Sequence, residues 1–233
     1  MARWVKCLIA LILLPFLFAS IWFLWICLER TTVWPVRELG LLGAGVLMAV
    51  LAYIWLPRPT WLYVFGHETT HALAVWCSGG RVLDFRVSGK GGRVVSDRIS
   101  PVIALAPYVF PFYPAVVVVL WLGLEMFWPQ VQGFRDVFWM VWGVAWGFHG
   151  AFTVSVLKTA QPDFASQGYL FSFVAIALGN VWLSTGLLWW WLRPFSLGEG
   201  LVTVGQMTGQ SYERVWGWIG WVIEWLWSLR RTI

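Results

Sequence analysis

The chain has 233 residues, of which 60% are hydrophobic and only 12% are charged, and its mean hydropathy is +0.72. A soluble domain normally carries about 25% charged residues, so this chain has too few charges to cover a water-facing surface. The composition therefore excludes an ordinary soluble domain and predicts that the bilayer is the main solvent. The net charge of +5 comes from scattered basic residues, which argues against nucleic-acid binding. The three cysteines, Cys7, Cys27 and Cys77, lack metal-type spacing, and we expect them to be packing residues.

Long apolar segments dominate the chain, and each approaches the ~20 residues that cross the hydrocarbon layer. There are six of them: Val5–Leu28, Leu39–Leu56, Trp61–Cys77, Ile99–Trp128, Val137–Leu157 and Tyr169–Leu192. We therefore expect an all-α integral membrane protein with about six transmembrane helices. The fourth segment contains Pro101, Pro107, Pro111 and Pro114. Since proline interrupts helical hydrogen bonding, this segment must be kinked or broken.

One extended polar stretch, Ser78–Arg98, separates the third and fourth apolar segments. Within it, Leu83, Phe85 and Val87 alternate with polar residues, and Ser88–Gly92 supplies turn residues. This pattern predicts a small β-hairpin on the membrane surface.

The C-terminal segment Tyr212–Arg231 has helical periodicity. Its polar residues fall on one stripe, and tryptophan, isoleucine, valine and leucine fill the rest of the helical surface. We expect an amphipathic helix that lies in the membrane interface, with a seventh span as the alternative.

The sequence His67-Glu68-Thr69-Thr70-His71 lies inside the third apolar segment. Residues four apart share a helical face, so His67 and His71 can present their imidazoles to one zinc ion. Glu68 lies beside His67 and can act as general base towards the attacking water. Zinc suits this chemistry because it lowers the pKa of a water ligand to roughly 7.

A match as short as His67 to His71 can also arise by chance, or as a polar cluster that ties helices together. The apolar surroundings favour function, because a glutamate and two histidines inside a span cost roughly kilocalories each unless they are paired or neutralised.

A catalytic zinc site needs a third protein ligand. The end of the fifth span returns to the side of the membrane where the third span ends, which brings two candidates near the motif. We favour Asp163 as the ligand, because a carboxylate at the membrane edge is a suitable donor and Pro162 can stiffen its turn. His149 is the alternative ligand, or a group that polarises the reacting carbonyl; the other interpretation of His149 is a buried histidine bonded to a backbone carbonyl.

The arrangement of these motifs resembles the site-2 protease family of intramembrane zinc metalloproteases, peptidase family M50. The similarity covers roughly Trp61–Leu192: a His-Glu-x-x-His helix, a glycine-rich β-forming loop, a proline-containing span and a later aspartate. The resemblance implies that His67, His71 and Asp163 bind zinc and that Glu68 activates water. The chain departs from the family in having Gln161-Pro162-Asp163-Phe164 around the aspartate, without a following glycine, and Ala106-Pro107-Tyr108 where relatives often have Gly-Pro and a nearby Asn.

The resemblance implies a metalloendopeptidase that cleaves transmembrane protein substrates in the bilayer, with the prokaryotic plasma membrane as the expected location. We divide the chain accordingly into N-terminal helices (residues 1–60), a metalloprotease-like core (61–192) and a Trp-rich interfacial segment (193–233). Two roles are open for the hairpin: it holds an unwound substrate by edge pairing, or it is a surface-lying loop that only closes the fold. The kinked fourth span is expected to act as a gate. Two non-proteolytic alternatives stay open: an ion or proton transporter, and an inactive protease-like scaffold.

Overall fold

A computed structural model describes residues 2–89, 91–158 and 162–231. The chain forms two compact units: Met1–Trp34 with Gly168–Ile233, and Pro35–Gln167. This division differs from the three consecutive parts expected at residues 60/61 and 192/193. The reason is that the helix after Gln167 packs against the N-terminal helix, so the two ends of the chain share one unit.

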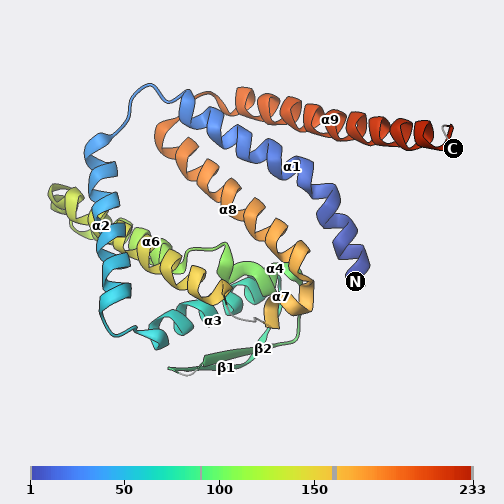
Figure 1. Cartoon of the computed structure of the whole chain (residues 1–233). Helices are drawn as coiled ribbons and strands as arrows, with labels where there is room; N and C mark the ends of the chain where they lie inside the picture. The colour runs from blue at the N-terminus through green and yellow to red at the C-terminus, as the bar shows by residue number, and fades with distance from the viewer. Residues whose placement is uncertain (1, 90, 159–161, 232–233) are drawn as a thin grey trace. The chain divides into compact units, whose positions relative to one another are not determined.

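The first unit contains three long helices: α1 (Arg3–Glu29), α8 (Tyr169–Leu192) and α9 (Leu197–Arg231). Helix α1 packs against both α8 and α9 (Figure 1). Phe23 and Cys27 of α1 and Val204 of α9 are buried together. The expectation that all three cysteines are packing residues is wrong for Cys7 and Cys77, which are exposed.

Within its described residues, the second unit contains eight helical segments, two of them 3-10 helices, and one hairpin. They are α2 (Val36–Trp55), α3 (Thr60–Cys77), β1 (Val82–Ser88), β2 (Gly91–Ser96), α4 (Pro101–Leu105), η1 (Ala106–Tyr108), α5 (Phe112–Phe127), η2 (Pro129–Phe134), α6 (Arg135–Leu157) and α7 (Pro162–Gln167).

Four helical stretches among the described residues are long and apolar enough to cross a membrane: Arg3–Glu29, Val36–Trp55, Pro129–Leu157 and Tyr169–Leu192. The helices on either side of Val109–Pro111 are bent by 75° and would add a fifth span if they count as one, which confirms the predicted break. The predicted third span, Trp61–Cys77, does form a helix. It falls outside this apolar set because its polar motif lowers its hydropathy, so the expected six spans become four or five. The fold is thus mostly helical with one small sheet, as expected for an all-α membrane protein.

Close backbone packing joins α2 to α6 in the second unit. A Cβ atom at Gly45 would lie 2.1 Å from the Met140 carbonyl oxygen, and one at Gly143 would lie 2.1 Å from the Leu42 carbonyl oxygen. No larger residue fits at either position without separating the helices. Small residues at such contacts are typical of helix pairs in membranes, where close approach increases van der Waals packing.

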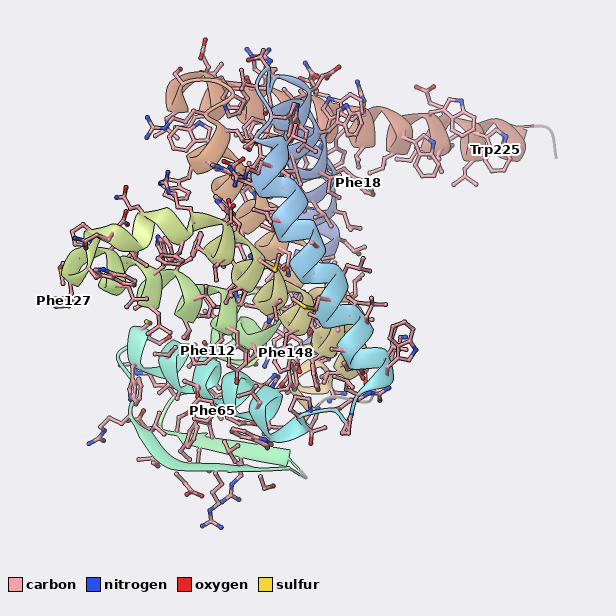
Figure 2. All side chains as sticks on the ribbon, turned by 90° about the vertical axis from the view of Figure 1, so that its left-hand side faces the viewer. Phe18, Phe65, Phe112, Phe127, Phe148 and Trp225 are labelled. Carbon is pink, nitrogen blue, oxygen red and sulfur yellow. The ribbon has the colours of Figure 1, made fainter. Side chains whose placement is uncertain are left out.

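Aromatic side chains fill the space around α3, as the sticks in Figure 2 show for Phe65, Phe112 and Phe148. The Phe65 and Phe112 rings meet edge to face at 6.2 Å. Tyr113 meets Phe148 at 5.2 Å, and its hydroxyl donates a hydrogen bond to the Leu62 carbonyl. These contacts fix α3 against α5 and α5 against α6, and thereby help to fix the position of the histidine motif.

The predicted hairpin is confirmed as an antiparallel pair of β1 and β2, which pairs Phe85 with Val94 and Arg86 with Arg93. The predicted turn Ser88–Gly92 includes residue 90, which lies outside the described residues. Phe85 meets Phe65 of α3 edge to face at 6.4 Å. One face of the hairpin therefore lies against the motif helix.

Helix α9 begins at Leu197, fifteen residues before the amphipathic segment that the sequence indicates. Its first half packs on α1, where the Tyr212 hydroxyl donates to the Ile12 carbonyl at 2.7 Å. Its second half carries five exposed tryptophans: Trp216, Trp218, Trp221, Trp225 and Trp227. The interfacial position of this half stays a prediction.

Candidate metal centre

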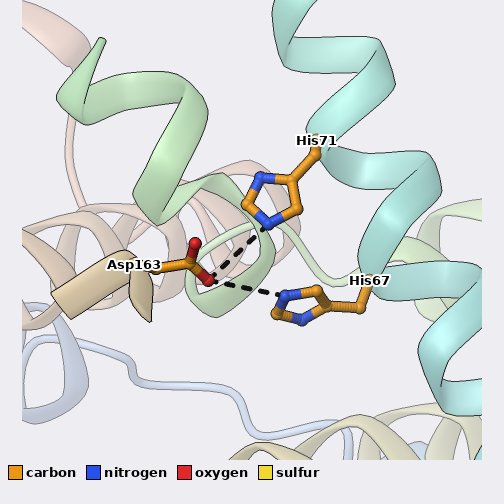
Figure 3. A group of neighbouring side chains, drawn as sticks. All are labelled: His67, His71 and Asp163. Carbon is orange, nitrogen blue, oxygen red and sulfur yellow. Dashed lines mark ion pairs between the residues drawn. The ribbon is translucent and has the colours of Figure 1, made fainter. Parts of the chain in front are cut away.

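His67, His71 and Asp163 come together in the second unit, although Asp163 is far from the histidines in sequence (Figure 3). Both histidines point from one face of α3 towards α7, which carries Asp163 near its start. The Nε2 atoms of His67 and His71 each lie 3.7 Å from Oδ2 of Asp163. The two histidine side chains are 11% and 12% exposed, and that of Asp163 is 25% exposed. The site is thus shielded but still open on the aspartate side.

The donor set of these three residues fits a zinc ion. One ligand atom from each residue lies within 4.8 Å of the other two. Ligand atoms around tetrahedral zinc are roughly 3.3 Å apart, so the 3.7 Å separations need only a small adjustment. Two imidazole nitrogens and one carboxylate oxygen also match the ligand types of catalytic zinc sites, which leave a fourth position open.

His71 is held in the tautomer that metal binding requires. Its Nδ1 lies 2.8 Å from the carbonyl oxygen of Ile103 in α4. Because a carbonyl can only accept, Nδ1 carries the proton and donates it. In the neutral imidazole, Nε2 therefore keeps its lone pair and faces Asp163, which is the arrangement that an outer hydrogen bond gives to metal-binding histidines.

Asp163 is fixed from a second direction by Tyr108. The Tyr108 hydroxyl donates to Oδ2 of Asp163 at 2.9 Å, and the tyrosine is only 1% exposed. Burial by itself raises the pKa of Asp163, but the imidazoles of His67 and His71, when their Nε2 atoms carry a proton in the metal-free site, and the Tyr108 hydroxyl outweigh it and hold the pKa below its usual range. The carboxyl group therefore stays ionised, as a metal ligand must be.

Glu68 is buried, at 8% exposed, and lies beside this group on the neighbouring face of α3. It shares with the three residues a cleft of about 380 Å³. The walls of the cleft come from α3, β2, the segment after β2, α4 and α7, and its lining includes Glu68, Gly92, Val94, Ser96, Arg98, Ser100, Ile103 and Ser166. The carboxylate that the sequence predicts as general base therefore lines the same cleft as the three candidate ligands.

His149 is not part of the three-residue group, nor does it line the cleft. It lies on α6, before that helix ends, and lines a separate small cavity with Tyr63, Phe110 and the candidate ligand His67. Among the described residues, the structure thus groups Asp163, and not His149, with the two motif histidines. The expected role of His149 as a ligand or as a group that polarises the substrate carbonyl stays a prediction.

Sequence reasoning missed the groups that orient the ligands. Ile103 orients His71 through its backbone carbonyl, and no pattern of side chains in the sequence predicts such a contact. Tyr63 was also overlooked, although its hydroxyl lies 3.4 Å from Nδ1 of His67. Tyr108 was noted only for standing at a position where the resembled family differs. The available signal was Pro107, because a proline inside a span leaves a carbonyl four residues earlier without its helical donor.

No protein-family model, curated protein or solved structure matches this chain.

Proposed function

We propose that this protein is a zinc metalloendopeptidase that hydrolyses peptide bonds within or near the transmembrane segments of other membrane proteins. One observation carries the proposal: two histidines four residues apart and a distant aspartate converge, next to a buried glutamate, in one cleft. The long apolar helices support a membrane setting. The resemblance to site-2 proteases supports the same assignment through the same four residues.

His67, His71 and Asp163 would hold zinc, which supplies Lewis-acid polarisation and lowers the pKa of water. Glu68 would accept a proton from the attacking water while the water oxygen bonds to the peptide carbonyl carbon. The carbon–nitrogen bond then breaks, and Glu68 returns the proton to the leaving amine. One carboxylate thus serves as base and then as acid, and the reaction consumes one water for each bond cleaved.

The hairpin supports a way to present the substrate. Peptide bonds of a membrane helix are hydrogen-bonded internally, so a substrate must unwind locally before attack. Strand β2 has β1 on one side only within the described two-stranded sheet, and Gly92, Val94 and Ser96 line the cleft. An unwound segment can add to the free edge of β2 as a further strand. A photo-crosslinker at Ser96 should then capture substrate, whereas one at Ser88, near the hairpin tip, should not.

The decisive variant for this proposal is Glu68→Gln, which keeps the size of the side chain and removes its basicity. Wild type and variant are compared for zinc content and for cleavage of a panel of single-span membrane proteins in co-reconstituted vesicles. We expect unchanged zinc and a loss of cleavage of roughly 10²-fold or more. Cleavage at the wild-type rate by Glu68→Gln would contradict the proposal. Ion flux without any cleaved product would instead identify a transporter.

A further inference from the structure

The short arm of the broken span, Pro101–Tyr108, touches two of the three candidate ligands. The Ile103 carbonyl accepts the Nδ1 proton of His71 at 2.8 Å. The Tyr108 hydroxyl donates to Oδ2 of Asp163 at 2.9 Å. Both contacts therefore come from one eight-residue segment that carries no candidate ligand of its own.

Pro107 explains why the Ile103 carbonyl is available. In an uninterrupted α-helix, the carbonyl of residue 103 accepts the N–H of residue 107. Proline has no N–H, so this acceptor loses its usual partner. Since Ile103 is itself buried, at 8% exposed, its carbonyl needs another donor, and His71 provides one.

Contacts with two neighbouring rings hold the Tyr108 side chain in place. Its ring lies edge to face with that of His67, with centroids 5.3 Å apart, and packs on the Phe164 ring at 4.6 Å. The hydroxyl therefore has little freedom to turn away from Asp163. It binds the same carboxylate oxygen that faces both histidines.

We infer that the break in the fourth span builds the outer shell of the metal site: Pro107 frees the carbonyl that orients His71, and Tyr108 anchors Asp163. Both are positioning residues that set the affinity for the metal. The role assigned to this arm differs from that of a gate, since a segment that orients ligands must keep its place during turnover. The inference rests on the proposed function only in requiring that the site binds zinc.

The test measures zinc affinity of the full-length, detergent-solubilised protein by competition with a chelator. Tyr108→Phe removes the hydroxyl and keeps the packed ring, and Pro107→Ala restores an N–H that competes with His71 for the Ile103 carbonyl. Loss of such outer partners typically weakens metal binding 10–100-fold, and we expect each variant to fall about in this range. The absorption spectrum of the Co²⁺-loaded protein should also change, because the ligand field depends on the orientation of His71 and Asp163.

Two variants serve as matched controls. Tyr212→Phe removes a hydroxyl bonded to the Ile12 carbonyl, in the first unit, which holds none of the candidate ligands. Pro101→Ala removes a proline from the first turn of α4, where a missing N–H has no helical acceptor. Both should keep wild-type affinity and Co²⁺ spectrum. Wild-type affinity and spectrum in Tyr108→Phe and Pro107→Ala would overturn this inference alone, whereas a wild type that binds no zinc would overturn the proposed function.

Discussion

Gly92 of β2 lies directly against the side chain of Glu68. A Cβ atom at position 92 would lie 2.4 Å from Cγ of Glu68 and 2.8 Å from Cγ1 of Val64. The hairpin strand and the motif helix are therefore in contact at the residue expected to move protons. Glycine is needed here for close approach, and because of it β2 forms one wall of the cleft that holds the candidate ligands.

The substitution Gly92→Ala should displace the Glu68 side chain without touching any ligand. A displacement of about 1 Å can lower the rate of a catalysed reaction by roughly 10²-fold, because the attacking groups lose alignment. We expect a loss of cleavage of this order with unchanged zinc content. Gly89→Ala in the same hairpin is the control, since its Cβ would meet only Thr60 Oγ1, at 3.9 Å. Equal activity of the two variants would show that the contact does not position Glu68.

Packing between α2 and α6 gives a second prediction. Gly143→Ala places a methyl group against the Leu42 carbonyl, where there is no room, and such overpacking costs about 1–3 kcal/mol. Gly150→Ala, on the same helix with nothing within 4 Å, should keep stability or raise it by up to about 1 kcal/mol, because alanine favours the helix over glycine. Thermal unfolding of both variants in the same detergent measures the difference, and an equal Tm would contradict the close packing of these helices.

The base of the hairpin should loosen in acid. The backbone N–H of Arg81 donates to Asp97 at 2.7 Å and its Nε at 3.1 Å. These bonds hold the pKa of Asp97 below its usual range, and the Arg93 hydrogen bond does the same for the pKa of Asp84. The pKa of each of these carboxyl groups is lower in the folded than in the unfolded state. Each group therefore stabilises the hairpin fully above the unfolded-state pKa, near 4, and this stabilisation is lost as the pH falls through the folded-state pKa.

A spin label at position 89, in a background without the native cysteines, reports on this loosening. Its mobility should stay constant from neutral pH down to about 4 and rise below that value. Asp97→Asn should show higher mobility at neutral pH and a smaller change in acid. A rise in mobility centred near neutral pH would assign the change to other groups.

The exposed tryptophans of α9 predict where its second half lies. Tryptophan favours the membrane interface, and the polar stripe includes Glu213 and Glu224. Spin labels at positions 224 and 226 should differ, with 224 accessible to a water-soluble relaxing agent and 226 to oxygen dissolved in lipid. In a transmembrane helix, accessibility to the two agents would instead change with position along the helix axis and would be the same on all of its faces. That result would indicate a seventh span.

The sequence predicted the elements of the fold well where periodicity and composition determine them. The helices around Trp61–Cys77 and Val137–Leu157, the hairpin and the proline break all appear. The number of membrane spans and the division of the chain into two units were harder to predict from the sequence. Polar residues at His67–His71 lower the hydropathy of their helix, and the packing of α8 on α1 is a long-range contact that no local pattern encodes.

The candidate site was predictable to the extent that it consists of side chains with a fixed helical spacing. His67, Glu68 and His71 follow from the motif, and the topology of the spans already favoured a ligand from the region of Asp163. The role of His149 stays a prediction, because the sequence places this histidine on a helix but does not say which cavity it faces. The Ile103 carbonyl and the contact of Gly92 depend on tertiary packing and could not be read from local sequence.

Zinc content per chain tests the central claim most directly. The purified wild type should bind about one zinc, and His67→Ala and Asp163→Ala should lose it, because each removes one of the three donors. His149→Ala should keep its zinc, since this histidine lies outside the group. A folded wild type that binds no zinc even after supplementation would contradict the account, and would leave His67, His71 and Asp163 as a polar cluster without a metal.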